Sequence, residues 1–198
     1  GTTEVGVVEE EALQPEGNQE LGDAQPDTAV ATGSLASLAS VGADQDGEFS
    51  IDTGFAGASG LTTNGGADPI YYVVDDANNL RGNTAADGSG TDIFSLNVTS
   101  AGAYTFTLLD QIDHHPVASA DDIEGSLDID FTNAILVTDE DGDQLSLSAV
   151  DQSPAFSITV WDDVPEQTGT TETGVVEEEA LQPEGNQELG DVQPDTAV

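Results

Sequence analysis

The chain has 198 residues, of which 40 are acidic and one is basic, so its formal net charge is −39 at pH 7. Nucleic acid is therefore excluded as a partner, because phosphate binding needs clustered Lys and Arg. The sequence contains no cysteine and no apolar run long enough to cross a bilayer, so neither disulfides nor direct membrane insertion are expected.

The first 30 residues return almost unchanged as residues 169–198, with differences at Val5/Thr173 and Ala24/Val192. This duplication predicts a tandem array, of which the chain holds one full repeat and the opening of the next. Three parts are expected: a linker and opening segment with one edge strand (1–30), a β-sandwich (31–165), and a linker with the next opening segment (166–198). We expect the second copy, which lacks a body of its own, to be poorly packed or docked on a neighbouring molecule.

Short segments rich in β-branched and aromatic residues follow the opening. Ala31–Ser40 is expected to start the folded body, Gly47–Asp52 to be a strand and Thr53–Asp68 to be a loop. Further strands are predicted at Ile70–Val74, Ile93–Val98, Tyr104–Leu109, Leu127–Phe131, Ala134–Thr138, Leu145–Val150 and Phe156–Trp161. Their spacing is typical of an all-β, antiparallel sandwich, and no convincing amphipathic helix interrupts it.

The charge opposes this fold, because a chain so acidic repels itself on compaction and its composition alone favours disorder. The carboxylates must therefore be neutralised if the strands are to pack. Divalent cations, and Ca²⁺ in particular, are the expected partners.

The strongest local candidate for a metal site is Asp139-Glu140-Asp141-Gly142-Asp143, between two predicted strands. The Asp-Gly pair is typical of a tight hairpin turn. A turn does not explain why Asp139, Asp141 and Asp143 alternate, since their side chains then repel each other. Converging oxygen ligands are what Ca²⁺ prefers, so we predict a calcium site here, although the spacing is not that of an EF-hand loop.

A second candidate lies where the last strand ends, at Asp162 and Asp163. One interpretation is a solvated strand end; the other is a junction site in which these residues share Ca²⁺ with Glu177, Glu178 or Glu179 of the next opening segment. Such a site would stiffen the Gly/Thr linker at Thr168–Thr171. Asp44 and Asp113 complete the set of candidate calcium ligands.

The other polar features give weaker signals. His114 and His115 point to opposite faces of an extended chain, so one zinc ion cannot easily use both, and a hydrogen-bonded structural role is favoured. The pairs Asp44/Asp46 and Asp75/Asp76 are weaker calcium candidates, because isolated acidic pairs in loops are usually just solvated.

Enzyme activity is not expected, because the chain has no G-x-S-x-G, no H-E-x-x-H and no cysteine nucleophile. The alternative to a structural role is binding of a carbohydrate or cell surface, through loops such as Thr53–Asp68 or Ala77–Thr91.

Several motifs together resemble a known family. Gly102–Asp110, followed by Asp113-His114, resembles the G-x-Y-x-F-x-L-L-D…D-H-P core of the tandem repeats of type I secreted (RTX) giant bacterial adhesins. Asp139–Asp143 and Val160–Pro165 look like the rest of that signature, and Val8–Leu13 with Thr32–Ala36 look like its opening. His115 departs from the pattern, and the glycine-rich nonapeptide repeats of such adhesins do not occur in this sequence.

The resemblance implies an immunoglobulin-like β-sandwich that acts as an extender, or spacer, in a surface-anchored adhesin for adhesion or biofilm formation. It implies secretion to the bacterial cell surface, where calcium is abundant. The partners it implies are neighbouring identical repeats, each a monomeric module of the same polypeptide.

Overall fold

The computed structural model describes residues 2–13, 28–41, 47–114, 125–147, 153–163 and 170–174, and most of their regular structure is β-strand. The chain divides into two units, Gly1–Glu166 and Gln167–Val198. In the second unit the described residues, 170–174, are exposed and have no regular secondary structure. All strands described below belong to the first unit.

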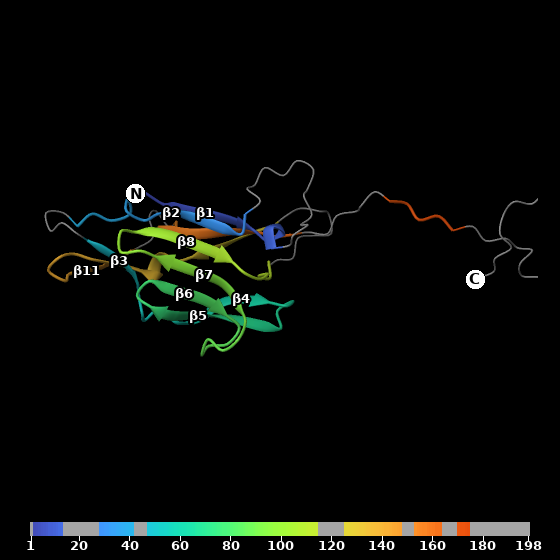
Figure 1. Ribbon diagram of the computed structural model, residues 1–198, viewed down its shortest axis with the longest axis horizontal. Coiled ribbons are helices and arrows are strands. Elements are labelled where there is room, and N and C mark those ends of the chain that lie inside the picture. The colour runs from blue at the N-terminus through green and yellow to red at the C-terminus, as the bar shows by residue number, and fades with distance from the viewer. Residues whose placement is uncertain are drawn as a thin grey trace, which may run out of the picture. The chain divides into compact units, whose positions relative to one another are not determined.

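One layer of the sandwich is a six-stranded antiparallel sheet (Figure 1). Its strand order is β2 (Val30–Ser34), β8 (Ala103–Leu108), β7 (Asp92–Val98), β6 (Asn79–Asn83), β5 (Asp68–Asp76) and β4 (Gly57–Thr63). Sequential neighbours β4 to β8 pair in a meander, as short connections favour.

Two three-stranded sheets complete the sandwich. One has the order β1 (Glu4–Glu9), β12 (Phe156–Trp161) and β9 (Ser126–Asp130), and the other the order β11 (Gln144–Ser146), β10 (Ile135–Thr138) and β3 (Glu48–Ile51). Two short 3₁₀ turns, η1 (Glu11–Leu13) and η2 (Thr132–Ala134), follow β1 and β9. Among the described residues no helix is long and apolar enough to span a membrane.

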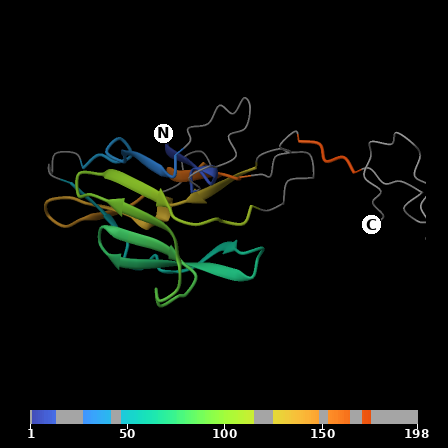
Figure 2. The ribbon, with the colours of Figure 1, turned by 45° about the vertical axis from the view of Figure 1, so that its right-hand side comes forward.

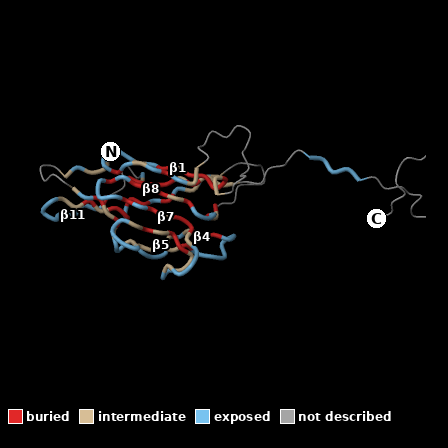
Figure 3. The backbone as a smooth tube through the Cα atoms, in the orientation of Figure 1, coloured by how far each residue is buried: buried red, intermediate tan, exposed pale blue. Residues whose placement is uncertain are grey.

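The core lies between these layers and is built on aromatic rings. On β8 the burial alternates, with Tyr104, Phe106 and Leu108 pointing inward. Phe131 is fully buried, and its ring centroid lies 5.9–6.1 Å from those of Tyr72, Phe94, Phe106 and Phe156. Figure 3 shows the buried residues (red) recurring along β1, β7 and β8.

β1 and β12 form a parallel pair (Figure 2), whereas the other strand pairs in the described part of the chain are antiparallel. Glu4 pairs with Phe156 and Glu9 with Trp161. Gly6 allows the close approach, because a Cβ there would lie 2.6 Å from Ile158 Cδ1 and 3.0 Å from Ala31 Cβ. The opening segment is thus part of the first unit.

The expected all-β sandwich is confirmed. The strands predicted from alternating apolar residues are present, but the loops predicted at Thr53–Asp68 and Ala77–Thr91 were wrong, since they contain β4 and β6. β4 is rich in glycine and threonine, and pairing with β5 across a register shift between Ala58 and Thr62 holds it in the sheet. Of the strand predicted at Leu145–Val150, the described part ends as a strand at Ser146.

Candidate metal centre

The parallel pairing of β1 with β12 brings the ends of the two strands to one edge of the sandwich. Glu10 N donates to Trp161 O at 3.1 Å, which continues the ladder past the strand ends. Glu10 and Asp162, each the residue after its strand, therefore lie next to each other. This juxtaposition follows from register alone, because parallel strands end at the same edge.

Three consecutive glutamates at this edge are buried. Glu9 is 0% exposed, Glu10 is 3% exposed and Glu11 is 8% exposed. Glutamates are almost never buried so far unless they are paired or bind a metal, because desolvating a carboxylate is costly.

The Glu10 carboxylate lies among other acids. Its Oε1 accepts a hydrogen bond from Ile112 N at 2.7 Å. Burial, together with repulsion from Asp162, Asp163 and Asp113, raises the pKa of Glu10 to about 8, against the lowering effect of the Ile112 hydrogen bond. Burial and the neighbouring Asp162 likewise raise the pKa of Asp163. A bound cation would reverse both effects by stabilising the ionised carboxylates.

His114 is buried beside this acidic group. Its Nδ1 lies 2.9 Å from Ile112 O, and its Nε2 lies 3.2 Å from Val160 O. A carbonyl oxygen can only accept, so both bonds form together only when both ring nitrogens carry a proton. Nδ1 also lies 3.5 Å from Asp162 Oδ1 and 3.9 Å from Glu10 Oε1. His114 is thus held by main-chain carbonyl groups beside the two carboxylates.

A pocket of about 360 Å³ opens next to this group. The polar residues that line it include Glu10, Asn64, Gln111, Asp113, Asp162 and Asp163. Asp113 is anchored at its rim, since its carboxylate accepts from Gly65 N at 2.8 Å and Gly66 N at 2.6 Å. We name Glu10, Asp113, His114, Asp162 and Asp163 the edge cluster.

The donor set of the edge cluster fits a divalent cation. One carboxylate oxygen of Glu10 lies within 4.8 Å of one of Asp162, while both ring nitrogens of His114 are engaged with main-chain carbonyl groups. Calcium takes oxygen ligands at about 2.3–2.6 Å, so two ligands of one ion lie no more than about 5 Å apart. The carboxylates that follow the two strands supply the hard oxygen donors that Ca²⁺ prefers.

The second acidic group, Asp139, Asp141 and Asp143, occupies the turn between β10 and β11, and its ligand atoms also lie within 4.8 Å of one another. Asp139 Oδ1 accepts from Gly142 N at 3.1 Å and Asp143 N at 2.8 Å, and Gly142 has a φ of +95°. A hydrogen bond between the carboxyls lowers the pKa of Asp139 and raises that of Asp141. The turn is therefore built by Asp139, while Asp141 and Asp143 remain exposed beside it.

The structure places the remaining candidates as follows. The first copy's Glu10, the equivalent of Glu178, lies beside Asp162. The glutamates of the second copy that were predicted to share Ca²⁺ with Asp162 and Asp163 lie outside the described residues. Asp44 and Glu179 lie outside the described residues. Glu10 and His114 were not among the predicted ligands, although the run of three glutamates in both copies was a signal that could have indicated Glu10.

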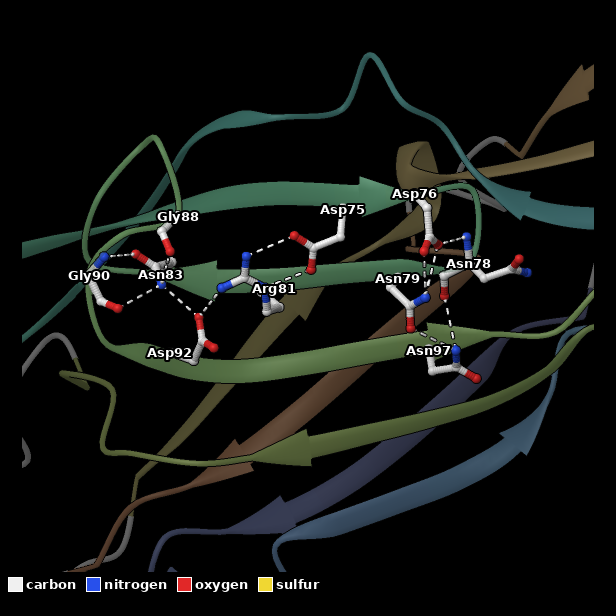
Figure 4. Close-up of polar contacts among 10 residues, drawn as sticks. All are labelled: Asp75, Asp76, Asn78, Asn79, Arg81, Asn83, Gly88, Gly90, Asp92 and Asn97. Atoms are coloured by element: carbon white, nitrogen blue, oxygen red, sulfur yellow. Dashed lines mark hydrogen bonds and ion pairs between the residues drawn. The ribbon is translucent and has the colours of Figure 1, made fainter.

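The single basic side chain, Arg81 on β6, is committed elsewhere (Figure 4). Its guanidinium binds both oxygens of Asp75, at 2.6 and 2.7 Å, and one oxygen of Asp92. Asp76 accepts hydrogen bonds from Asn78 N and the Asn79 side chain, which closes the turn between β5 and β6. Asp75 and Asp76 thus stabilise the sheet through these bonds, and Arg81 does not neutralise the buried glutamates.

Comparison with known proteins gives one match. A search of the curated proteins found no match, and neither did a search of the solved structures. The model of one family, described as "Domain of unknown function (DUF5801)", matches residues 7–151, which is more than half of the chain. The matched range runs from β1 to the segment after β11 and includes Glu10, Asp113, His114 and the Asp139–Asp143 turn. The chain therefore belongs to the DUF5801 family.

Proposed function

We propose that the chain is a calcium-stabilised structural extender repeat of a large adhesin, secreted to the bacterial cell surface, where it holds a distal binding module away from the cell. The observation that carries the proposal is the burial of Glu9, Glu10 and Glu11 beside Asp162, in a chain whose one basic side chain is bound elsewhere. The repeated ends and the motifs shared with adhesin repeats support the extender role.

Calcium at the edge cluster would tie the first strand of the repeat to the last. Glu10 follows β1 and Asp162 follows β12, so one ion bound by both would bridge residues far apart in sequence. An ion with free concentration a hundredfold above its Kd stabilises the folded state by about 2.7 kcal/mol. That is a large share of a stability margin of about 5–15 kcal/mol.

The same strand pair suits a load-bearing role. The chain enters β1 at Glu4, opposite Phe156, and leaves β12 at Trp161, opposite Glu9. Tension along an array would therefore pull the two strands past each other and load all hydrogen bonds of the pair together. Ca²⁺ at the far end of this pair would resist that sliding.

Thermal unfolding of the whole chain in Ca²⁺ and in EDTA tests the calcium component. The midpoint is expected to rise in Ca²⁺ for the wild type, and to rise far less for Glu10→Gln, which keeps an oxygen acceptor for Ile112 N but loses the charge. Glu48→Gln on β3 is the matched control, because Glu48 is exposed. Equal midpoints of the wild type in Ca²⁺ and EDTA would contradict the proposal.

Single-molecule pulling tests the extender component. With handles at the two ends, the unfolding force of the first unit is expected to be higher in Ca²⁺ than in EDTA. A unit that is stabilised by Ca²⁺ against heat but unfolds at the same force in both buffers would separate calcium binding from load bearing, and would overturn the extender role.

A further inference from the structure

β1 occupies a position beside β12 that has narrow steric requirements. It is the edge strand of its sheet, paired with β12 over six residues. Val8 is fully buried, and Gly6 leaves no room for a side chain, since a Cβ would meet Ile158 Cδ1 at 2.6 Å and Tyr104 Oη at 3.0 Å. Glu4 accepts a hydrogen bond from Tyr104 Oη at 3.2 Å. A strand that pairs with β12 in place of β1 must reproduce these features.

The second copy of the opening segment reproduces every one of them. Glu172, Gly174 and Val176 stand where the first copy has Glu4, Gly6 and Val8, and Glu177–Glu179 stand where it has Glu9–Glu11. Within the strand the two copies differ only at Val5/Thr173. Val5 is 52% exposed, so the difference falls on a residue that points away from the core.

We propose that residues 172–177 are an interchangeable β1 that docks on β12 of a second copy of this chain. The docking surface is the edge of β12 together with Ile158, Ala31 and Tyr104, whose side chains pack closely against Gly6. Main-chain hydrogen bonds supply affinity, and the fit of glycine and valine supplies specificity. This inference goes beyond the extender function and does not depend on calcium.

The length of the connection directs the exchange to another molecule. Ten residues, 162–171, separate Trp161 from Glu172. A parallel strand needs a crossover of about a dozen residues or more to return beside its predecessor. Asp162 N is also bonded to Gly125 O at 2.9 Å, which shortens the free connection further. The exchange is therefore head-to-tail, giving closed dimers where the geometry closes and open chains where it does not.

The molecule's own β1 competes for the same edge of β12 with an effective concentration of about millimolar. At micromolar protein the wild type is therefore expected to remain monomeric. The exchange becomes visible when the molecule's own strand is disabled and the second copy is left intact.

Three variants of the whole chain test this. Gly6→Val disables the first copy, whereas Gly174→Val disables the second without disturbing its surroundings, because a Cβ at Gly174 meets nothing within 4 Å. Light scattering after gel filtration measures mass, and circular dichroism measures β-content. We expect Gly6→Val to keep its β-content and to form dimers or larger species that increase with concentration, and Gly174→Val to stay monomeric.

The double variant Gly6→Val/Gly174→Val separates exchange from unspecific aggregation. It is expected to lose the oligomers of Gly6→Val and to melt at a lower temperature than either single variant. Oligomers in the double variant equal to those of Gly6→Val would overturn the proposal, and so would a monomeric Gly6→Val that is as unstable as the double variant.

Discussion

Ile112 N donates a hydrogen bond to Glu10 Oε1 at 2.7 Å, although 102 positions separate the two residues in the chain. The bond joins the opening strand to the segment that follows β8, and Asp162 joins the same group from the end of β12. Since none of these segments is local to another, the edge cluster exists only in the folded chain. Any cation it binds stabilises folding directly.

The buried Glu10 predicts an unusual pH dependence in the absence of divalent cations. Its pKa is about 8 in the folded chain and 4.5 in the unfolded reference, so the folded state favours the protonated form. The contribution of Glu10 to stability is therefore complete below pH 4.5, falls as the pH rises from 4.5 to 8, and is lost above that. The loss amounts to about 5 kcal/mol at most.

Urea unfolding in EDTA, just above pH 4.5 and at about pH 8, measures this dependence. The wild type is expected to lose stability relative to Glu10→Gln between the two pH values, while Glu48→Gln keeps the slope of the wild type. A wild type and Glu10→Gln that differ by the same free energy at both pH values would contradict the assignment. Saturating Ca²⁺ is expected to remove the wild-type slope.

Phe131 is predicted to be the most sensitive position of the core. Its ring contacts Tyr72, Phe94, Phe106 and Phe156 and is 0% exposed. Phe131→Ala leaves a cavity between the layers and is expected to lower the free energy of unfolding by about 3–5 kcal/mol. Phe55→Ala is the matched control, because Phe55 is only partly buried and its ring contacts that of Tyr72 alone among the described rings, with centroids 4.8 Å apart. Equal losses for the two variants in urea unfolding would show that Phe131 is not central.

Much of the fold could be predicted because the central strands carry a local pattern. β8 alternates inward aromatic or apolar residues with outward threonine and alanine, and β7 and β12 are dense in apolar residues. β4 and β6 lack such a pattern. Gly82 on β6 lies against Phe94, where a Cβ would approach a ring carbon to 2.2 Å, so this glycine is required by packing that the sequence of the strand does not reveal.

The candidate sites differ in the same way. The Asp139–Asp143 turn is local, and its Asp-Gly pair and alternating carboxylates could be read from five residues. The edge cluster depends on the register of β1 against β12, which is set by long-range packing at Gly6 and Val8. The sequence could predict that other carboxylates share a cation with Asp162. It could not show which copy of Glu-Glu-Glu lies beside Asp162, because the two copies are identical there.

Asn83 is predicted to hold the connection between β6 and β7. Its side chain is 0% exposed; Oδ1 accepts from Ala85 N at 2.8 Å and Gly90 N at 3.0 Å, and Nδ2 donates to Asp92 Oδ1 at 2.6 Å (Figure 4). Nδ2 also donates to Gly90 O at 3.1 Å and Gly88 O at 3.5 Å. Asn83→Ala removes all of these bonds and is expected to cost about 1–3 kcal/mol. Asn97→Ala on β7, whose exposed amide bonds to Asn79, is expected to cost less. Hydrogen exchange at Ala85 and Gly90 should quicken in the Asn83 variant, and unchanged protection there would refute the role.

Two variants of the Asp139–Asp143 turn distinguish its structural contribution to stability from a metal-binding contribution. Asp139→Ala removes the acceptor for two backbone amides, so its melting midpoint is expected to fall in both EDTA and Ca²⁺. Asp141→Asn leaves those bonds intact and removes a carboxyl that repels Asp139, so its midpoint in EDTA is expected to match or exceed that of the wild type. If the turn binds Ca²⁺, Asp141→Asn gains less from Ca²⁺ than the wild type does. Calorimetric melts in the two buffers measure both effects. If the rise of the midpoint in Ca²⁺ is undiminished in Asp141→Asn, the turn is a structural feature only, and the edge cluster is the site that responds to calcium.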